Sequence, residues 1–176
     1  MADMTGSKID FFDHYVGGRS RMKRNAFLCL ILIIALALSG CAKGRINKGK
    51  YGREQVTEIL RCFDERDIAG LKAMFCEKVA SEHDLDSEIK DAMELYNGKS
   101  ISHDKVQFGG GEAVYHGVMN ESHIWYNINN LETDNGSVYT IATFSYIVYE
   151  DDPSCIGISY LNLIDENTHK KIEIGE

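Results

Sequence analysis

Residues 123–149 read HIWYNINNLETDNGSVYTIATFSYIVY, and this stretch decides the fold. Both of its halves, 123–131 and 138–149, are rich in β-branched and aromatic residues, which favour β-strands. Asn135-Gly136 lies between the halves, and an Asn-Gly pair between two strand-like runs is a strong signal for a tight hairpin turn. The stretch therefore predicts two antiparallel strands joined by a short turn.

Further strand-like runs flank this hairpin at residues 101–108 and 156–164, with a weaker run at 171–174. Turn residues separate them. We interpret Gly109-Gly110-Gly111 as a bulge or a loose loop and residues 151–154 as a turn, because glycine, aspartate and proline punctuate regular structure. The second half of the chain is thus expected to form an antiparallel meander.

Helical patterns occupy the region before the first strand. In residues 54–66, apolar residues recur at the spacing of one helix face: Val56, Ile59, Leu60 and Phe63. Asp67 is expected to cap a second, short helix that ends near Phe75, since an aspartate side chain accepts backbone N–H groups at a helix start. A third helix is predicted from about Asp86 to Asn97-Gly98. Helices followed by a meander indicate an α+β fold with three N-terminal helices packed on one face of a curved sheet.

The segment before residue 42 has the features of a secretory signal. Two cations at Lys23 and Arg24 precede an apolar run that ends at Leu38-Ser39-Gly40-Cys41. The run is shorter than the roughly 20 apolar residues that span a bilayer. The Leu38–Cys41 motif resembles the lipobox of bacterial lipoproteins, which implies cleavage between Gly40 and Cys41 and attachment of diacylglyceryl, and commonly palmitate, at Cys41.

Three regions follow from this assignment. Residues 1–40 are expected to be a signal peptide, with Met22 as a possible true start. Residues 41–53 would form a basic, glycine-containing tether beside the lipid, and residues 54–176 the folded domain. The predicted location is the extracytoplasmic face of the cell membrane. A tether of this charge either is attracted to anionic headgroups there or is simply a solvated linker.

The charge of the mature chain argues against nucleic acid as a partner. Removing residues 1–40 takes away five of the 19 basic and three of the 27 acidic residues, which leaves a net charge of −10. A chain this acidic lacks the electrostatic attraction that nucleic-acid binding uses. We expect no nucleic-acid ligand.

Three cysteines would remain besides Cys41, namely Cys62, Cys76 and Cys155. An oxidising compartment permits a Cys62–Cys76 bridge. Both residues also lie in helical patterns, where a free thiol packs as a small apolar group, and we favour that alternative. The cysteines and histidines lack zinc-ligand spacing, so we expect neither a metal nor a cofactor.

The order of elements resembles the nuclear-transport-factor-2-like, or cystatin-like, cone. More narrowly, four segments are similar to a family of uncharacterised bacterial lipoproteins that carry a domain of unknown function: residues 58–75, 95–100, 133–139 and 157–165. The resemblance covers about Gln55 to Glu166. It implies lipid attachment and the cone fold. It assigns no catalytic residue, and the same cone hosts both enzymes and binding modules.

Candidate pocket residues are tyrosines on the predicted strands, because enzymes of the broad superfamily place an acid or base inside the cone. The candidates are Tyr126, Tyr146 and Tyr160, with Tyr139, His116 and His123 as further titratable groups. Strand tyrosines are more often packing residues than proton donors. The sequence therefore favours a lipid-anchored binding or interaction module for an unknown protein or a small apolar ligand. The alternatives are a pocket enzyme with isomerase- or hydrolase-like acid/base chemistry, or a homodimer.

Overall fold

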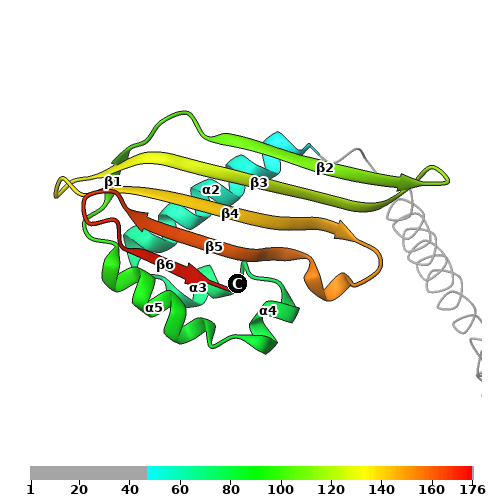
Figure 1. Ribbon diagram of the computed structural model, residues 1–176, viewed down its shortest axis with the longest axis horizontal. Helices are drawn as coiled ribbons and strands as arrows, with labels where there is room; N and C mark the ends of the chain where they lie inside the picture. The colour runs from blue at the N-terminus through cyan, green and yellow to red at the C-terminus, as the bar shows by residue number, and fades with distance from the viewer. Residues whose placement is uncertain (1–46, 176) are drawn as a thin grey trace, which may run out of the picture. The chain divides into compact units, whose positions relative to one another are not determined.

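The computed structural model describes residues 47–175. Along the chain the α-helices come first and the strands of the sheet follow (Figure 1). The elements are α2 (Lys48–Glu65), α3 (Ile68–Lys72), α4 (Glu77–Glu82), α5 (Leu85–Leu95), β1 (Ser100–Ser102), β2 (Gln107–Tyr115), β3 (Val118–Thr133), β4 (Val138–Tyr149), the 3₁₀ helix η1 (Pro153–Cys155), β5 (Gly157–Asp165) and β6 (Lys171–Ile174). The predicted signal peptide, Cys41 and the first residues of the tether lie outside the described residues.

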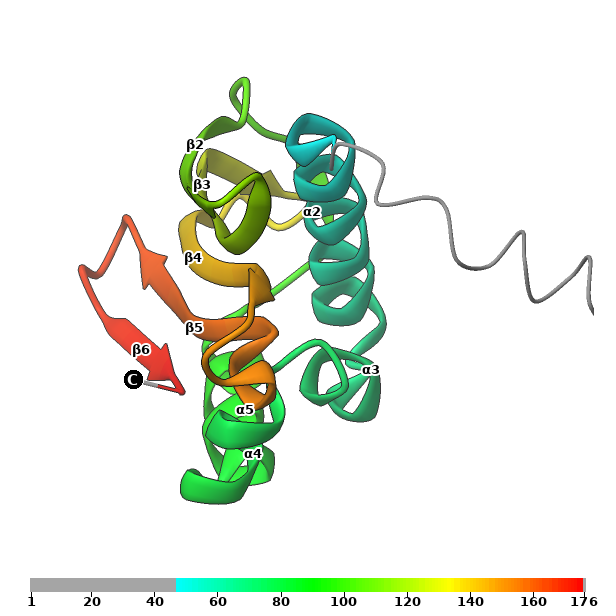
Figure 2. The same ribbon diagram turned by 90° about the vertical axis from the view of Figure 1, so that its right-hand side faces the viewer.

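The six strands form one curved antiparallel sheet. β1 and β2 each pair with β3, and the order continues through β4, β5 and β6. Figure 2 shows α2 along one face of this sheet. The helices α3, α4 and α5 lie beyond the C-terminal end of α2. Among the described residues no helix covers the opposite face. The predicted α+β architecture is confirmed. None of the described helices is long and apolar enough to cross a membrane.

The helix α2 begins earlier than the sequence predicts. The Asn47 side chain accepts a hydrogen bond from the N–H of Lys50 at 3.0 Å and caps the helix, which starts at Lys48, six residues before the predicted start at 54. Residues 48–53, which the sequence assigns to the tether, are therefore helical. Gly52 lies so close to Ile124 of β3 that a Cβ atom there would be 2.9 Å from the Ile124 side chain. The glycine lets α2 approach the sheet.

The sequence predicts α3 and α5 but not α4. The Asp67 carboxylate accepts a hydrogen bond from the N–H of Gly70 at 2.8 Å and caps α3, as predicted. Helix α5 follows the predicted third helix closely, with Asp84 as its cap. The sequence misses α4, because this six-residue helix has no side-chain cap and only Val79 is buried.

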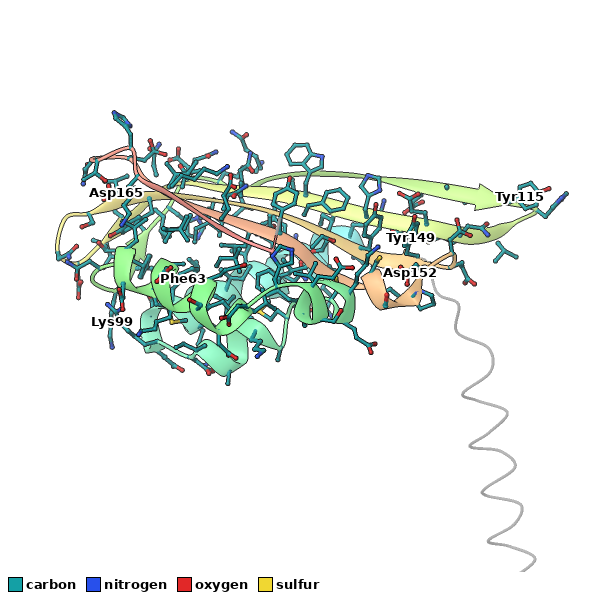
Figure 3. All side chains as sticks on the ribbon, turned by 60° about the horizontal axis from the view of Figure 1, so that its bottom comes forward. Phe63, Lys99, Tyr115, Tyr149, Asp152 and Asp165 are labelled. Carbon is teal, nitrogen blue, oxygen red and sulfur yellow. The ribbon has the colours of Figure 1, made fainter. Side chains whose placement is uncertain are left out.

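The core lies between the helices and the sheet. Phe63 of α2 is buried at its centre, with its ring 5.0 Å from that of Tyr96 (Figure 3). Leu71 and Phe75 are buried beside the same cluster, as their helical spacing predicts. Cys62 and Cys76 are also buried, and both are free thiols.

The prediction of a bulge or a loose loop at Gly109–Gly111 is wrong. These glycines lie in the middle of β2, which pairs with β3 from Gln107 to Tyr115. The predicted strand at 101–108 is instead divided into the short β1 and the start of β2. Close packing explains the glycines, since a Cβ atom at Gly110 would lie 2.2 Å from the carbonyl oxygen of His123.

The predicted hairpin joins β3 to β4. Gly136 has φ +85°, and the N–H of Thr133 donates to the carbonyl of Ser137 at 3.0 Å. A β-bulge then interrupts β3 between Ile128 and Leu131, where Asn130 takes φ +48°. Because a bulge adds one residue to one strand, it changes which residues of β3 face the core. Ile128 and Leu131 are both buried as a result.

Candidate functional site

The uncovered face of the sheet carries a row of rings across three strands. Trp125 of β3 is opposite Phe144 of β4, which is opposite Tyr160 of β5. His123 and Tyr146 form the next pair along β3 and β4. Residues directly opposite each other on neighbouring strands share a face. We call these five residues the aromatic face.

Four rings of the aromatic face, those of His123, Phe144, Tyr146 and Tyr160, contact one another in a continuous chain. The ring centroids are 5.2 Å apart for His123 and Phe144, 5.1 Å for Phe144 and Tyr146, and 6.0 Å for Phe144 and Tyr160. Tyr149 extends the chain by stacking on Tyr146 at 4.7 Å. Such offset and edge-to-face pairs hold aromatic side chains in fixed positions.

The glycines of β2 widen this surface. The Trp125 indole lies against Gly109, where a Cβ atom would be 2.5 Å from the ring, and the His123 imidazole lies against Gly111 in the same way. Trp125 nevertheless remains 42% exposed. The aromatic face is therefore preformed and open to solvent at its largest residue.

A cluster of hydroxyl and amide groups lies on the other side of the sheet, beneath α2. Gln55 donates to the Tyr51 hydroxyl at 3.2 Å and accepts from the Ser145 hydroxyl at 3.3 Å. Tyr126 and Thr143, which are opposite each other on β3 and β4, point into the same buried region. Neither of their hydroxyls has a hydrogen-bond partner. We call these five residues the hydroxyl cluster.

The hydroxyl cluster contains no group that is a base near neutral pH. None of its five members is a carboxylate or an imidazole. Burial raises the pKa of Tyr126 and of Tyr51 above the usual range of tyrosine, so both stay protonated and neutral at physiological pH. The cluster can donate and accept hydrogen bonds but cannot act as a general base near neutral pH.

A carboxylate does face a tyrosine elsewhere, at Asp64 of α2. Its oxygens accept hydrogen bonds from the Tyr96 hydroxyl at 3.0 Å, from the N–H of Ser100 at 2.8 Å and from the Ser100 hydroxyl. These bonds tie α2 to the end of α5 and to the start of β1. Asp64 is thus occupied by contacts that hold the fold together.

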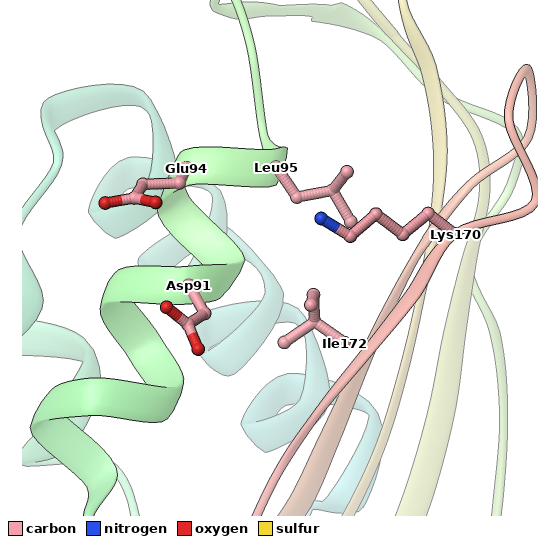
Figure 4. Close-up of a pocket in the computed structure, with 5 residues that line it drawn as sticks. All are labelled: Asp91, Glu94, Leu95, Lys170 and Ile172. Atoms are coloured by element: carbon pink, nitrogen blue, oxygen red, sulfur yellow. The ribbon is translucent and has the colours of Figure 1, made fainter.

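A hollow of about 450 Å³ lies between α5 and β6. Asp91, Glu94 and Leu95 line it from α5, and Lys170 and Ile172 from the β6 side. Figure 4 shows the Lys170 side chain extending towards α5, whereas the Glu94 carboxylate points away from it. The hollow contains neither a cysteine, a serine nor a histidine that could act on a substrate.

The structure separates the three tyrosines that the sequence groups as a possible pocket. Tyr146 and Tyr160 belong to the aromatic face, whereas Tyr126 is fully buried on the helix side of the sheet. They therefore do not line one pocket. Tyr139 is also on the helix side, and His116 lies in the turn between β2 and β3.

Sequence reasoning misses Trp125 and Phe144 as members of the site. Trp125 is two residues from His123, and Phe144 is two residues from Tyr146. Since residues i and i+2 of a strand share a face, this spacing indicates that each pair lies on one face of the sheet. Within residues 47–175, no group of three or more His, Cys, Asp or Glu residues could hold a metal ion.

Comparison with known proteins gives one match. Residues 58–166 match the profile of a family described as a domain of unknown function, DUF5104. No curated protein matches the chain. The matched segment runs from α2 to the end of β5 and so includes the aromatic face.

Proposed function

We propose that this chain, which belongs to the DUF5104 family, is a lipid-anchored extracytoplasmic interaction module that binds through its aromatic face. The observation that carries the proposal is the group of four contacting rings on an uncovered sheet face, with the exposed Trp125 opposite Phe144. The proposed fold assignment is the nuclear-transport-factor-2-like cone. The long helix α2 across a curved antiparallel sheet supports it.

The anchor is supported by the sequence before residue 42. Lys23 and Arg24, the apolar run and the Leu38–Cys41 motif match the parts of a lipoprotein signal in their order. A diacylglyceryl group supplies two acyl chains, and two chains give stable attachment where one gives only marginal binding. Cys41 would then hold the domain at the outer surface of the membrane.

The partner that we propose for the aromatic face is a second copy of this chain. The mature chain carries a net charge of −10, so two copies repel each other. This repulsion is weakest when the surface of contact has few charged groups. At the centre of the sheet the row next to the rings is uncharged and consists of Asn127, Ala142 and Asn162. The acid that borders the aromatic face is Glu121 at its edge, with its carboxylate 2.8 Å from Nδ1 of His123. Interface centres are enriched in aromatic residues and depleted of charge.

The residues beneath α2 favour a binding module over a pocket enzyme. A catalytic cone needs a group that can exchange a proton near neutral pH, whereas the hydroxyl cluster provides only hydroxyls that stay protonated and an amide. The rings, by contrast, are on the outside, where a macromolecular partner can reach them.

Metabolic labelling with a fatty acid tests the anchor. Wild-type protein expressed in a bacterial host should incorporate label, and Cys41→Ala should not, because the thiol is the site of acylation. The matched control is Cys29→Ala, which removes a cysteine from the signal itself and should leave labelling intact. Equal label on wild type and Cys41→Ala would contradict the anchor.

Sedimentation equilibrium tests the partner, with a soluble form that begins at Ala42. Wild type should sediment as a dimer, and Trp125→Arg should sediment as a monomer, because a charge at the centre of the interface is desolvated without a partner. Ile101→Arg is the matched control, since Ile101 is an equally apolar residue on β1, 66% exposed and outside the aromatic face. A wild type that stays monomeric at every concentration would overturn the proposed partner.

A further inference from the structure

The hairpin of β2 and β3 extends beyond the rest of the sheet. The last pairing between β3 and β4 is Glu121 with Tyr149, and the N–H of Glu150 donates to the carbonyl of Asn120 at 2.8 Å. Beyond this point residues 114–119 are paired only with each other. Figure 1 shows β2 and β3 continuing past the end of β4. Figure 3 shows Tyr115 at the far end of this extension, remote from Phe63 in the core. We call residues 113–120 the hairpin arm.

The arm is apolar and exposed. Its sequence, Ala-Val-Tyr-His-Gly-Val-Met-Asn, contains no acid, lysine or arginine, although such residues make up 26% of the chain. Val114 is 59%, Tyr115 68% and Val118 44% exposed. Tyr115 and Val118 are opposite each other on one face of the arm, and Val114 and Met119 on the other, so both faces are apolar. Exposed apolar surface in soluble domains marks contact with a protein or a membrane.

The arm stays ordered without help from the helices. The N–H of Tyr115 donates to the Asn120 side chain at 3.1 Å across the turn, and Gly117 takes the positive φ of +79° that the turn requires. The Tyr115 and His116 rings are in edge contact at 4.1 Å. The exposed side chains are therefore presented on a defined hairpin.

The start of α2 lies close to the base of the arm. Lys48 donates to the carbonyl of Gly111 at 2.7 Å and pairs with the Glu112 carboxylate at 3.1 Å. From Gly111 to Tyr115 the strand advances about 13 Å at the rise of a β-strand. From Cys41 to Asn47 the chain spans at most about 20 Å even when fully extended.

We propose that the hairpin arm inserts its apolar tip into the outer leaflet of the membrane and forms a second contact beside the lipid at Cys41. The proposal rests on the lipid anchor proposed above. The short tether keeps the start of α2 near the bilayer, and the contacts of Lys48 fix the base of the arm to that start. The tyrosine suits the position, because its amphipathic ring favours the headgroup region.

The arm would also fix the orientation of the domain. A single flexible tether lets a domain rotate freely, whereas a second contact restricts rotation. With the arm tip in the leaflet, β3 extends away from the membrane, and β1 and the Asn135-Gly136 turn lie at its distant end.

Quenching of a single tryptophan by brominated lipids tests the arm. The full-length chain, expressed so that it is lipidated, carries Trp125→Phe to remove its only tryptophan and Tyr115→Trp to place a new one in the arm. It is reconstituted into phosphatidylglycerol and phosphatidylcholine vesicles with or without bromine on the acyl chains. We expect emission to fall to roughly half or less with brominated lipid, because interfacial apolar groups reach about 5–10 Å into the headgroup and acyl boundary.

The matched control carries Trp125→Phe and Ile101→Trp. Ile101 is as exposed as Tyr115 but lies on β1, which pairs with β3 at the opposite end from the arm, so emission from a tryptophan there should be the same in both kinds of vesicle. Circular dichroism verifies that both variants fold, and mass spectrometry verifies acylation of Cys41. Acylated protein with no quenching at position 115, or with equal quenching at both positions, would overturn the arm contact. Unacylated protein would instead overturn the anchor.

Discussion

Tyr139 and Tyr126 are both fully buried on the helix side of the sheet, yet their hydroxyls have opposite surroundings. The Tyr139 hydroxyl donates to the carbonyl of Leu95 at 3.0 Å and accepts from the N–H of Asn97 at 2.9 Å. These bonds give partners to two backbone groups at the end of α5, where the chain turns towards the sheet. The Tyr126 hydroxyl has no hydrogen-bond partner.

Replacing each tyrosine by phenylalanine should separate these roles. Tyr139→Phe leaves two backbone groups without their partner and should lower the free energy of unfolding by about 1–3 kcal/mol. Tyr126→Phe removes a buried polar group that has no partner, so stability should stay constant or rise by up to about 1 kcal/mol. Urea unfolding followed by circular dichroism measures both. A Tyr126→Phe variant less stable than Tyr139→Phe would show that the Tyr126 hydroxyl has a partner.

At the scale of elements, the sequence determines most strands and helices but not which face of β3 is buried. The strand β4 and the strand β6 have the predicted bounds, and the Asn135-Gly136 turn joins the predicted pair. Counting outwards from that turn would nevertheless place Tyr126 opposite Phe144. The bulge near Asn130 shifts the pairing by one residue, so that Trp125 is opposite Phe144. This shift is why the pocket tyrosines could not be sorted by face from the sequence.

The glycines of β2 illustrate the same limit. Three consecutive glycines usually indicate a loop, because glycine lowers the stability of a regular strand. Here the neighbouring strand supplies the reason for them, since Trp125, His123 and the backbone of β3 occupy the space that side chains would need. Contacts between residues 12 to 16 positions apart in sequence, such as Gly111 with His123 and Gly109 with Trp125, are not visible in a local pattern.

Gly110→Ala should therefore destabilise the domain. Its Cβ atom would lie 2.2 Å from the carbonyl oxygen of His123, so β2 must move away from β3 or lose pairing. Gly49→Ala is the control, because a Cβ atom there meets its nearest neighbour at an ordinary 3.5 Å and alanine favours the helix α2 by up to about 1 kcal/mol. Thermal unfolding should show a lower midpoint for Gly110→Ala and an equal or higher one for Gly49→Ala. The reverse order would mean that β2 is not held against β3 as described.

For the whole molecule, one apolar core accounts for the folding of residues 47–175. The core joins all layers: Ile59 of α2, Leu71 of α3, Ile89 of α5 and Ile141 of β4 are all fully buried. The sequence predicts this core well, because helix periodicity and strand composition directly report burial. It predicts the candidate site less well, since the aromatic face depends on strand register and the hairpin arm on how far β4 extends.

A core of this kind should not depend on a metal or a disulfide. Cys62, Cys76 and Cys155 are free thiols, and burial raises the pKa of Cys62 to about 11, so this thiol stays protonated and unreactive at neutral pH. Differential scanning calorimetry of the mature domain should give the same unfolding midpoint in buffer, with a chelator and with a reductant. A midpoint that falls only with reductant would indicate a Cys62–Cys76 bridge. The control is Cys155→Ser, which alters the partly exposed thiol but neither buried one and should leave that reductant sensitivity unchanged. A midpoint that falls with the chelator would instead reveal a metal ion that contributes to stability.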